Sequence, residues 1–456
     1  MLYQRFLKRE KQCVFNLAFA WKSVLKYGKR TKRNDHMNVK VFCGAVVFAE
    51  TEKKVVEYDR AYIVVKGGKI EGIYPVLPEE YADAFTVDYS DGVMIPAFSD
   101  LHVHAPQYPQ RGIAMDELLY DWLHKYTFPL EERYADPFFA ESVYEAFCND
   151  LISRGTMNVA VYGTIHEEGT GKLIEKLESR GIRAFVGKIN MDVDCPQGLC
   201  ETVDGSLFAT ERFLEKYGKN RFARPILTPR FAPTCSRELL YGLGRLAKKY
   251  EVGMQTHLVE SLWEAEEATR RFPDCSCDAE IYEKAGLLGY GPFIGAHFIF
   301  PSEDDIRILQ KYDGFAVQCP DATTNVIAGI MRTGELLDRG IKLGLGSDVA
   351  AGQSLAVYAQ AASAVRLSKS KSFYEKSSRA ITFEESFYMA TKGGGRLFGK
   401  TGSFEKGYSF DALVLKGVAD GYQKLTPKQV VERFCYAGER ENIRARFLRG
   451  EELKIQ

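Results

Sequence analysis

Cysteine, long apolar runs and net charge are all scarce in this 456-residue sequence. Its ten cysteines include no Cys-x-x-Cys pair, and Cys275 and Cys277 are too close for an ordinary disulfide or a zinc ribbon. Scattered cysteines without a secretion signal are typical of a reducing cytoplasm. No apolar run approaches the roughly 18–20 residues of a membrane-spanning helix. The 61 Lys and Arg balance the 61 Asp and Glu, so charge gives no argument for a nucleic-acid or membrane partner.

The remaining composition is that of an ordinary globular protein. The chain is 45% hydrophobic and 27% charged, and its 16 Pro and 40 Gly exclude collagen-like and low-complexity classes. At about 150 residues per domain the length suggests about three domains, although barrels of about 200–250 residues form one. A chain of this length buries a sizeable core without disulfides.

Residues 1–36 differ from the rest of the chain, with ten Lys and Arg against Glu10 and Asp35. A short apolar stretch, residues 13–21, follows a basic region, which is the order of a signal peptide. No small-x-small cleavage site follows it, and Lys22 and Lys26 come next. We expect a dispensable basic extension that ends before Met37, with a basic surface arm or an address signal as alternatives.

From Met37 the sequence alternates between strand-like and helical patterns. Short strands are expected at 39–48, 61–65, 69–74 and 92–98, and again near the end at 411–415 and 444–448. Between them, a strand that ends near His104 is followed by strand-like runs at 157–162, 184–189, 224–229, 253–257, 293–297, 314–318 and 341–347. Amphipathic helical patterns separate these runs, at 136–153, 206–217, 237–250, 264–272 and 304–311.

Eight strands that alternate with helices predict an α/β protein with a (β/α)8 TIM-type barrel. The strands at the two chain ends are expected to pair into a small β-sandwich domain. The predicted organisation is an extension at 1–36, the β-sandwich at 37–95 and 400–456, and the metal-dependent barrel at 96–399.

Four of the seven histidines fall at the ends of predicted barrel strands: His102, His104, His257 and His297. Alternate residues of a strand share a face, so His102 and His104 project together into the barrel mouth, where barrel active sites lie. Asp348 follows the glycine-rich end of the eighth strand. Three imidazoles and one carboxylate are zinc ligands that leave a position for water. Glu260, three residues after His257, supplies a proton shuttle for hydrolysis at the same strand end.

Several segments resemble known sequences. Residues 96–104, PAFSDLHVH, resemble the first-strand motif of the amidohydrolase superfamily of metal-dependent hydrolases. Over roughly residues 37–450 the chain is also similar to the guanine deaminases of that superfamily. The segments that carry this similarity are HAPQY at 104–108, WLHKYTFP at 122–129, FVGKINMD at 185–192, TPRF at 228–231, GLGSDVA at 344–350 and GSFEKG at 402–407.

The resemblance implies hydrolysis of guanine to xanthine and ammonia, with one Zn²⁺ per subunit, in a cytoplasmic homodimer. It places the metal on His102, His104, His257 and Asp348. It makes Glu260 the proton-transfer residue and Asp348 the acceptor of a proton from the attacking water, which His297 supports. The residues that it implies contact the base are Gln107, Arg230, Phe231, His104, Glu260 and Asp348.

Two departures from the family pattern leave the exact base open: Glu260 lies between Val259 and Ser261, and residues 318–323 read QCPDAT. The alternatives are another aminopurine such as 8-oxoguanine or isoguanine, a pterin of the isoxanthopterin type, or a non-catalytic scaffold. Residues 394–401 satisfy the phosphate-loop pattern, but a helical segment precedes them. We expect Lys188 to bridge no second metal, His124 to be a packing residue, and His166 to lie in a loop or to line the pocket.

Overall fold

The computed structural model describes residues 39–419 and 421–454. The extension predicted at 1–36 lies outside these residues. Among the helices within them, none is both long enough and apolar enough to cross a bilayer.

Parallel strands form a barrel at eight positions, two of which are split into consecutive short strands. Every residue of the first two barrel strands is buried, as expected for parallel strands that are covered on both faces. The barrel strands are β5 (Phe98–His104), β6 (Thr156–Tyr162), β7 (Arg183–Gly187) with β8 (Ile189–Asn190), β9 (Ala223–Pro225) with β10 (Thr228–Pro229), β11 (Met254–Leu258), β12 (Phe293–His297), β13 (Phe315–Gln318) and β14 (Lys342–Leu345).

Backbone hydrogen bonds close this barrel at both of its seams. At one seam, Leu227 donates to the carbonyl of Gly253 at 3.0 Å, and Gln255 donates to the carbonyl of Leu227 at 2.9 Å. At the other, the N–H of Asp348 donates to the carbonyl of His102 at 2.8 Å. The predicted (β/α)8 fold is therefore confirmed, and its closing seam passes through two of the predicted site residues.

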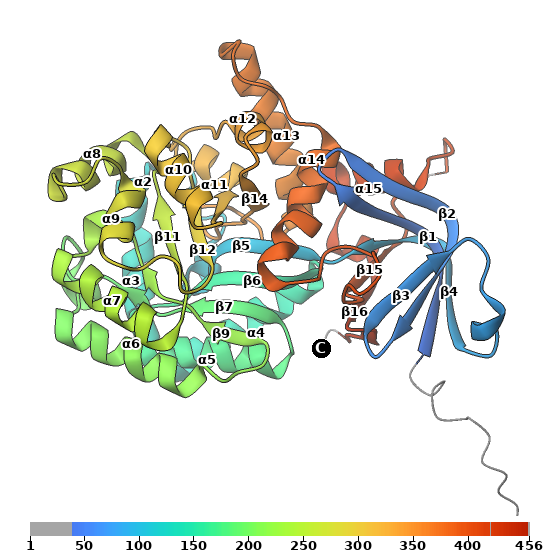
Figure 1. The fold of residues 1–456 in the computed structure, drawn as a ribbon, viewed down its shortest axis with the longest axis horizontal. Helices are drawn as coiled ribbons and strands as arrows, with labels where there is room; N and C mark the ends of the chain where they lie inside the picture. Colours follow the sequence, from blue (N-terminus) through green and yellow to red (C-terminus); the bar gives the residue numbers. More distant parts are fainter. Residues whose placement is uncertain (1–38, 420, 455–456) are drawn as a thin grey trace, which may run out of the picture. The chain divides into compact units, whose positions relative to one another are not determined.

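Helices connect the strands and lie outside them (Figure 1). Helix α7 illustrates why: Leu239, Leu243 and Leu246 recur at helical spacing and are buried, and the Ser236 hydroxyl accepts the N–H of Leu239 to cap the first turn. The α-helices after β5 to β13 are α2 (Leu119–Trp122), α3 (Phe128–Glu132), α4 (Pro137–Ser153), α5 (Glu167–Ser179), α6 (Val203–Tyr217), α7 (Arg237–Tyr250), α8 (Leu262–Arg271), α9 (Asp278–Lys284), α10 (Glu303–Lys311), α11 (Pro320–Asn325) and α12 (Thr333–Asp338).

Two further helices, α13 (Val357–Tyr374) and α14 (Phe383–Tyr388), follow β14. A π-helical turn at Met389–Gly393 continues α14, so no strand leads into residues 394–401. A phosphate-binding loop needs such a strand, which excludes that interpretation of the sequence pattern. Lys188 lies between β7 and β8, and its ammonium binds Glu201 at 2.7 Å.

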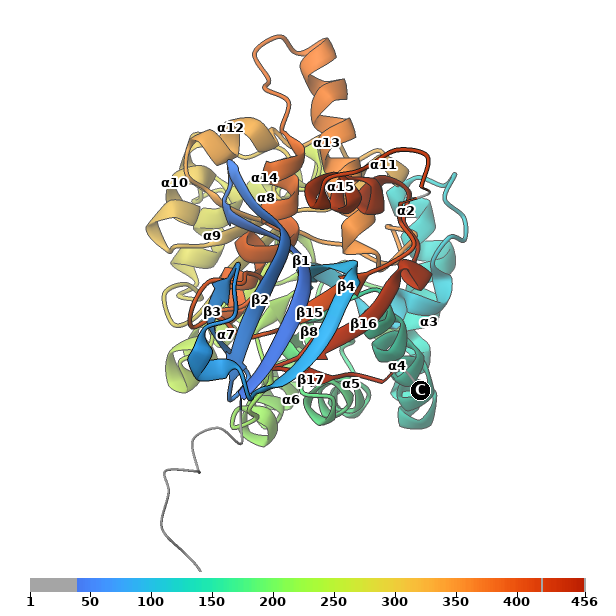
Figure 2. The same ribbon diagram turned by 90° about the vertical axis from the view of Figure 1, so that its right-hand side faces the viewer.

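Both ends of the described chain meet in one seven-stranded sheet (Figure 2). Its apolar side includes Phe42, whose ring stacks on Phe410 at 4.3 Å and meets Phe447 edge-on at 5.0 Å. The strands of the two chain ends thus pair as predicted, and they form one continuous sheet. In spatial order the strands are β17 (Glu451–Glu452), β16 (Ile443–Leu448), β15 (Ala412–Leu415), β4 (Phe85–Pro96), β1 (Val39–Thr51), β2 (Lys54–Lys66) and β3 (Lys69–Tyr74).

Candidate active site

A cavity of about 890 Å³ opens at the carboxyl ends of the barrel strands. Most of the site residues predicted from sequence line it, and His102 lies fully buried beside it. The lining residues from that set are His104, Gln107, Arg230, Phe231, His257, Glu260, His297 and Asp348.

Strand ends place the histidines and the aspartate. His102 and His104 end β5, His257 lies in β11, and His297 is the last residue of β12. Asp348 follows β14, where the seam of the barrel fixes its backbone. His297 and Asp348 have φ angles of 71° and 45°, in the left-handed region that non-glycine residues rarely adopt. Such strained positions cluster at functional sites.

The ring nitrogens of three histidines converge with the Asp348 carboxylate. His104 Nε2 lies 3.1 Å from His257 Nε2, and Asp348 Oδ1 lies 3.3 Å from His102 Nε2 and 3.6 Å from His104 Nε2. The ligand atoms of His102, His104 and His257 are within 4.8 Å of one another, as are those of His102, His297 and Asp348.

The chemistry of these donors fits a bound divalent cation. Burial lowers the pKa of His102 to about 3 and lowers the pKa values of His104 and His257 well below 6.5, so the rings are neutral and keep their lone pairs. Both ring nitrogens of His102 are buried without a hydrogen-bond partner. Buried polar groups are nearly always satisfied, and the lone pair that one of these nitrogens carries in the neutral ring fits a bound cation. Neutral imidazole and carboxylate are the ligands of catalytic zinc sites.

A backbone carbonyl sets the orientation of His257. Its Nδ1 lies 2.7 Å from the carbonyl oxygen of Arg230, and its own backbone N–H donates to the same oxygen at 3.2 Å. The carbonyl can only accept, so Nδ1 carries the proton and Nε2 presents its lone pair to the cluster.

Glu260 lies in the turn between β11 and α8, with Oε2 3.7 Å from His297 Nε2. Burial, and then the nearby Asp348 carboxylate, raise the pKa of Glu260 to about 8. The side chain is therefore protonated at neutral pH and is able to deliver a proton inside the cavity.

Glu131 and an apolar rim at this cavity were not predicted from the sequence. Glu131, from the short helix α3 (Phe128–Glu132), is buried and binds both Gln107 and Arg230. Glu131 and Glu132 are adjacent in sequence, and only the spacing of three residues from Phe128 could have singled out Glu131. An apolar rim surrounds the mouth, where the exposed side chains are Leu118 (59%), Tyr120 (70%), Trp263 (58%) and Ile327 (75%).

The two other histidines among residues 39–454, His124 and His166, lie in different places. His124 is exposed and lines the mouth of the cavity. Its ring packs against those of Tyr120 and Phe128, with centroids 4.1 Å and 5.2 Å away, so it is a packing residue at the surface. His166 precedes α5 and lies outside the cavity lining, which leaves the loop alternative. The cavity wall also contains Cys195, which forms a disulfide with Cys200 that the sequence analysis did not predict.

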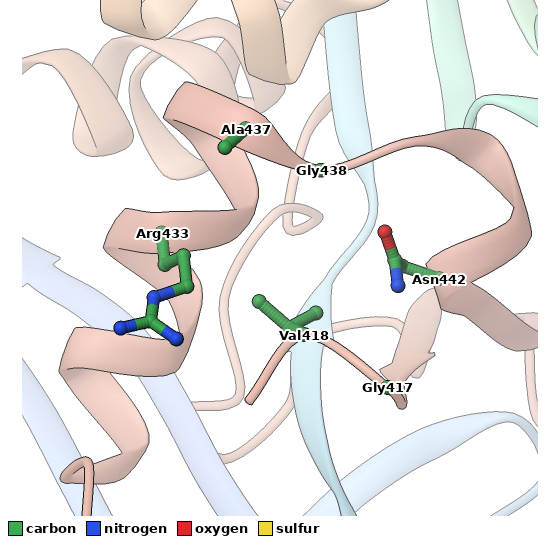
Figure 3. Close-up of a pocket in the computed structure, with 6 residues that line it drawn as sticks. All are labelled: Gly417, Val418, Arg433, Ala437, Gly438 and Asn442. Carbon is green, nitrogen blue, oxygen red and sulfur yellow. The ribbon is translucent and has the colours of Figure 1, made fainter. Parts of the chain in front are cut away.

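A second cavity, of about 320 Å³, lies beside helix α15 (Pro427–Ala437), away from the histidine cluster (Figure 3). The residues that line it are Gly417, Val418, Arg433, Ala437, Gly438 and Asn442. Arg433 is the ionisable residue among them, and this set contains no metal ligands and no proton-transfer residue. The chemistry of the protein therefore belongs to the cavity at the barrel mouth.

Comparison with known proteins agrees with this geometry. The model of the amidohydrolase family matches residues 93–452. Guanine deaminase of Dictyostelium discoideum is 32% identical over 379 residues, which cover 81% of this chain and 84% of that protein. Guanine deaminase of Mus musculus is 32% identical over 374 residues, 79% of this chain and 82% of that protein.

Among solved structures, a guanine deaminase from C. acetobutylicum with guanine bound in its active site is 38% identical. It superposes with a TM-score of 0.89 over 91% of this chain and 100% of that chain. Fold, metal-ligand cluster and sequence similarity lead to one assignment: the chain belongs to the amidohydrolase family and, within it, to the guanine deaminases.

Proposed function

We propose that the protein catalyses the hydrolytic deamination of guanine to xanthine and ammonia, in purine catabolism or salvage. One observation carries the proposal: the carboxyl group of Glu260, whose side chain is 13% exposed, shares a cavity with a His/Asp cluster and the Arg230 guanidinium. The named activity of the similar proteins, one of them with guanine bound, supports the choice of substrate.

We assign His102, His104, His257 and Asp348 as the residues that hold one Zn²⁺ per subunit. Zinc in such a site supplies an activated water at neutral pH. The neutral rings and the unpaired nitrogens of His102 support the assignment. Elemental analysis of the purified protein distinguishes zinc from iron.

The chain's own groups account for the proton transfers. Glu260 gives its proton to a ring nitrogen next to the carbon that bears the amino group, which makes that carbon electrophilic. The oxygen of water bonds to this carbon, and Asp348 accepts the proton that the water loses. His297, 3.9 Å from Asp348 Oδ2, orients that water. The C–N bond then breaks as the amino group takes the proton from Asp348, and ammonia leaves. The proton of the new hydroxyl group passes to Glu260 as the carbonyl of xanthine forms, which restores both carboxyl groups.

Three side chains account for recognition of the base. Arg230 and Gln107 offer hydrogen-bond donors to a carbonyl oxygen and a ring nitrogen of the purine. Phe231 lies beside them, with its ring centroid 6.3 Å from that of His257, and offers an apolar surface to the flat base. His104, Glu260 and Asp348 border the same space.

The test is ammonia release from a panel of guanine, 8-oxoguanine, isoguanine, adenine, cytosine and pterins. We expect guanine to have the highest kcat/KM, and Glu260→Gln to abolish release while the metal content is unchanged. Glu266→Gln, at an exposed position of α8, is the matched control and should keep full activity. A higher kcat/KM on a pterin or on 8-oxoguanine would overturn the choice of substrate, and a protein without metal or activity would be the scaffold alternative.

Three finer assignments are also part of the proposal. The chain divides into the β-domain at 37–95 and 400–456 and the barrel at 96–399, with a dispensable segment at 1–36. A homodimer is proposed from the resemblance alone, and sedimentation equilibrium tests it. A cytoplasmic location is proposed on the seven free, buried cysteines of the described chain, and the location of a tagged chain in cells tests it.

A further inference from the structure

Glu131 joins the two side chains that are proposed to bind the base. It is only 1% exposed, and its carboxylate accepts Arg230 Nη1 at 2.7 Å and Nη2 at 3.3 Å. The same carboxylate accepts Gln107 Nε2 at 2.9 Å. Arg230 follows β10 and Gln107 follows β5, so one carboxylate fixes donors from two separate parts of the barrel mouth.

Helix α3 holds Arg230 by two of its side chains. Phe128 lies three residues before Glu131, so the two side chains share a face of the helix. The guanidinium carbon of Arg230 lies 5.3 Å from the centroid of the Phe128 ring. A cation over an aromatic face and a two-point ion pair leave the guanidinium little freedom to rotate.

Glu131 also decides which way the Gln107 amide faces. A carboxylate only accepts hydrogen bonds, so the amide nitrogen must face Glu131 and the amide oxygen must face away. On that other side, Gln107 Oε1 accepts the backbone N–H of Ala350 at 3.2 Å. One hydrogen bond thereby holds the oxygen toward the backbone of Ala350, and the donor that Gln107 has left for a ligand is its second N–H.

We propose that Glu131 is a positioning residue that determines which bases the cavity selects. It holds Arg230 and Gln107 so that both present donors, which favours a neutral base with a carbonyl oxygen and a bare ring nitrogen over one with an amino group at that edge. Its negative charge also balances that of Arg230, so this ion pair adds no net charge to the wall of the cavity. This inference rests on the proposed function, because it names the groups of guanine that the two donors bind.

The central variant is Glu131→Gln, which keeps the shape of the side chain and removes its charge. Its amide can turn a donor toward Arg230 or Gln107, so one of the two donors loses its fixed direction. We expect kcat/KM on guanine to fall on the order of 10- to 100-fold, mainly through KM, with the metal content unchanged. The ratio of kcat/KM for guanine over adenine should fall with it. Glu132→Gln makes the same change at the exposed neighbouring position and should behave as wild type.

A double-mutant cycle with Arg230→Met separates positioning from general damage to the fold. If Glu131 acts through Arg230, the double variant Glu131→Gln/Arg230→Met should have nearly the same kcat/KM on guanine as Arg230→Met alone. Additive losses in the cycle, or an unchanged guanine-to-adenine ratio, would overturn the proposal. Glu131→Asp keeps the charge on a shorter side chain, so its kcat/KM should lie between those of Glu131→Gln and the wild type. If Glu131→Gln fails to fold, the same double-mutant cycle is measured with Glu131→Asp.

The same measurements separate this proposal from the proposed function. A wild type that deaminates another base of the panel but not guanine contradicts the choice of substrate. The cycle is then measured on that other base, where coupling between Glu131 and Arg230 still supports the positioning role and additivity still refutes it.

Discussion

The buried carboxyl group of Glu264 accepts a hydrogen bond from the backbone N–H of Glu260 at 2.7 Å and so holds the backbone of Glu260 in place. A second buried carboxylate, on Asp278, accepts the N–H of Val259 at 3.2 Å. Val259 has a φ angle of 47°, which is strained for a β-branched residue. Two buried carboxyl groups thus fix the turn that aims Glu260 into the cavity.

This relationship predicts a pH-dependent stability. Burial first, and then Glu260, raise the pKa of Glu264 above its ordinary value of 4.5. Above pH 4.5, Glu264 loses its proton in the unfolded chain but retains it in the folded protein. The free energy of unfolding therefore falls as the pH rises. Where Glu264 is fully protonated in the folded protein and fully ionised in the unfolded chain, the free energy of unfolding falls by about 1.4 kcal/mol per pH unit. Glu264→Gln removes the titration while its amide oxygen still accepts the N–H of Glu260.

Chemical denaturation of both proteins between pH 5 and pH 8 checks this prediction. The stability of Glu264→Gln relative to wild type should increase steadily across that range. Glu266→Gln, two residues later on the exposed side of α8, should follow the wild-type profile. Parallel profiles for Glu264→Gln and wild type would show that Glu264 is ionised in the folded protein.

The metal assignment gives a second prediction. His102→Ala or His257→Ala should lose most of the bound metal and nearly all activity, because each removes one of four converging ligands. His124→Ala is the matched control: its ring lies at the mouth of the same cavity but outside the cluster, so the metal content should stay unchanged. Elemental analysis of the three purified proteins decides, and a full metal complement in both ligand variants would refute the assignment.

The barrel and its histidines were predictable because they depend on local pattern. Buried parallel strands are short apolar runs, and the alternation of strand side chains brings His102 and His104 to one face. Two predicted strands, at 184–189 and 224–229, are each split in two in the structure. The first is interrupted at Lys188, and the second at residues 226–227. Pro225 and Pro229 lack an N–H and cannot donate within those strands.

Glu131 and the turn at Val259 could not be predicted, because tertiary contacts determine both. The spacing from Phe128 is the only local signal that separates the buried Glu131 from the exposed Glu132, and nothing in the sequence shows that the partners of Glu131 follow two separate strands. The left-handed conformation of Val259 runs against the preference of a β-branched residue and depends on Asp278. Rim residues such as Trp263 show no local signal either, because an exposed aromatic side chain on a helix is common.

A third prediction concerns the N-terminal segment. Every residue assigned to the site lies between Asp100 and Val349, so a chain that starts at Met37 should keep full turnover on guanine. Steady-state kinetics and thermal unfolding of the shortened and full chains are the measurements. A large loss of turnover or of stability in the shortened chain would show that residues 1–36 take part in folding or assembly.

The sharpest prediction concerns Arg230. Its guanidinium donates hydrogen bonds and never accepts them, and it is 4% exposed. Guanine has a carbonyl oxygen for it, whereas adenine has a donor amino group at that position. With adenine bound, the guanidinium N–H groups that Glu131 does not bind would be buried without a partner. An unpaired buried polar group costs several kcal/mol, enough for selectivity on the order of 10⁴ for guanine over adenine.

Arg230→Met should therefore lose most guanine turnover while the metal content is unchanged, because Arg230 is not among the metal ligands. The selectivity of this variant for guanine over adenine should also fall, because it lacks the guanidinium donor for which adenine offers no acceptor. Arg224→Met, at an exposed position of β9, makes the same chemical change outside the cavity and should leave both quantities at their wild-type values. Ammonia release from guanine and adenine by the three proteins is the measurement. If Arg230→Met retains wild-type selectivity, Arg230 does not read the carbonyl oxygen, and discrimination must come from Gln107 or from the proton transfer by Glu260.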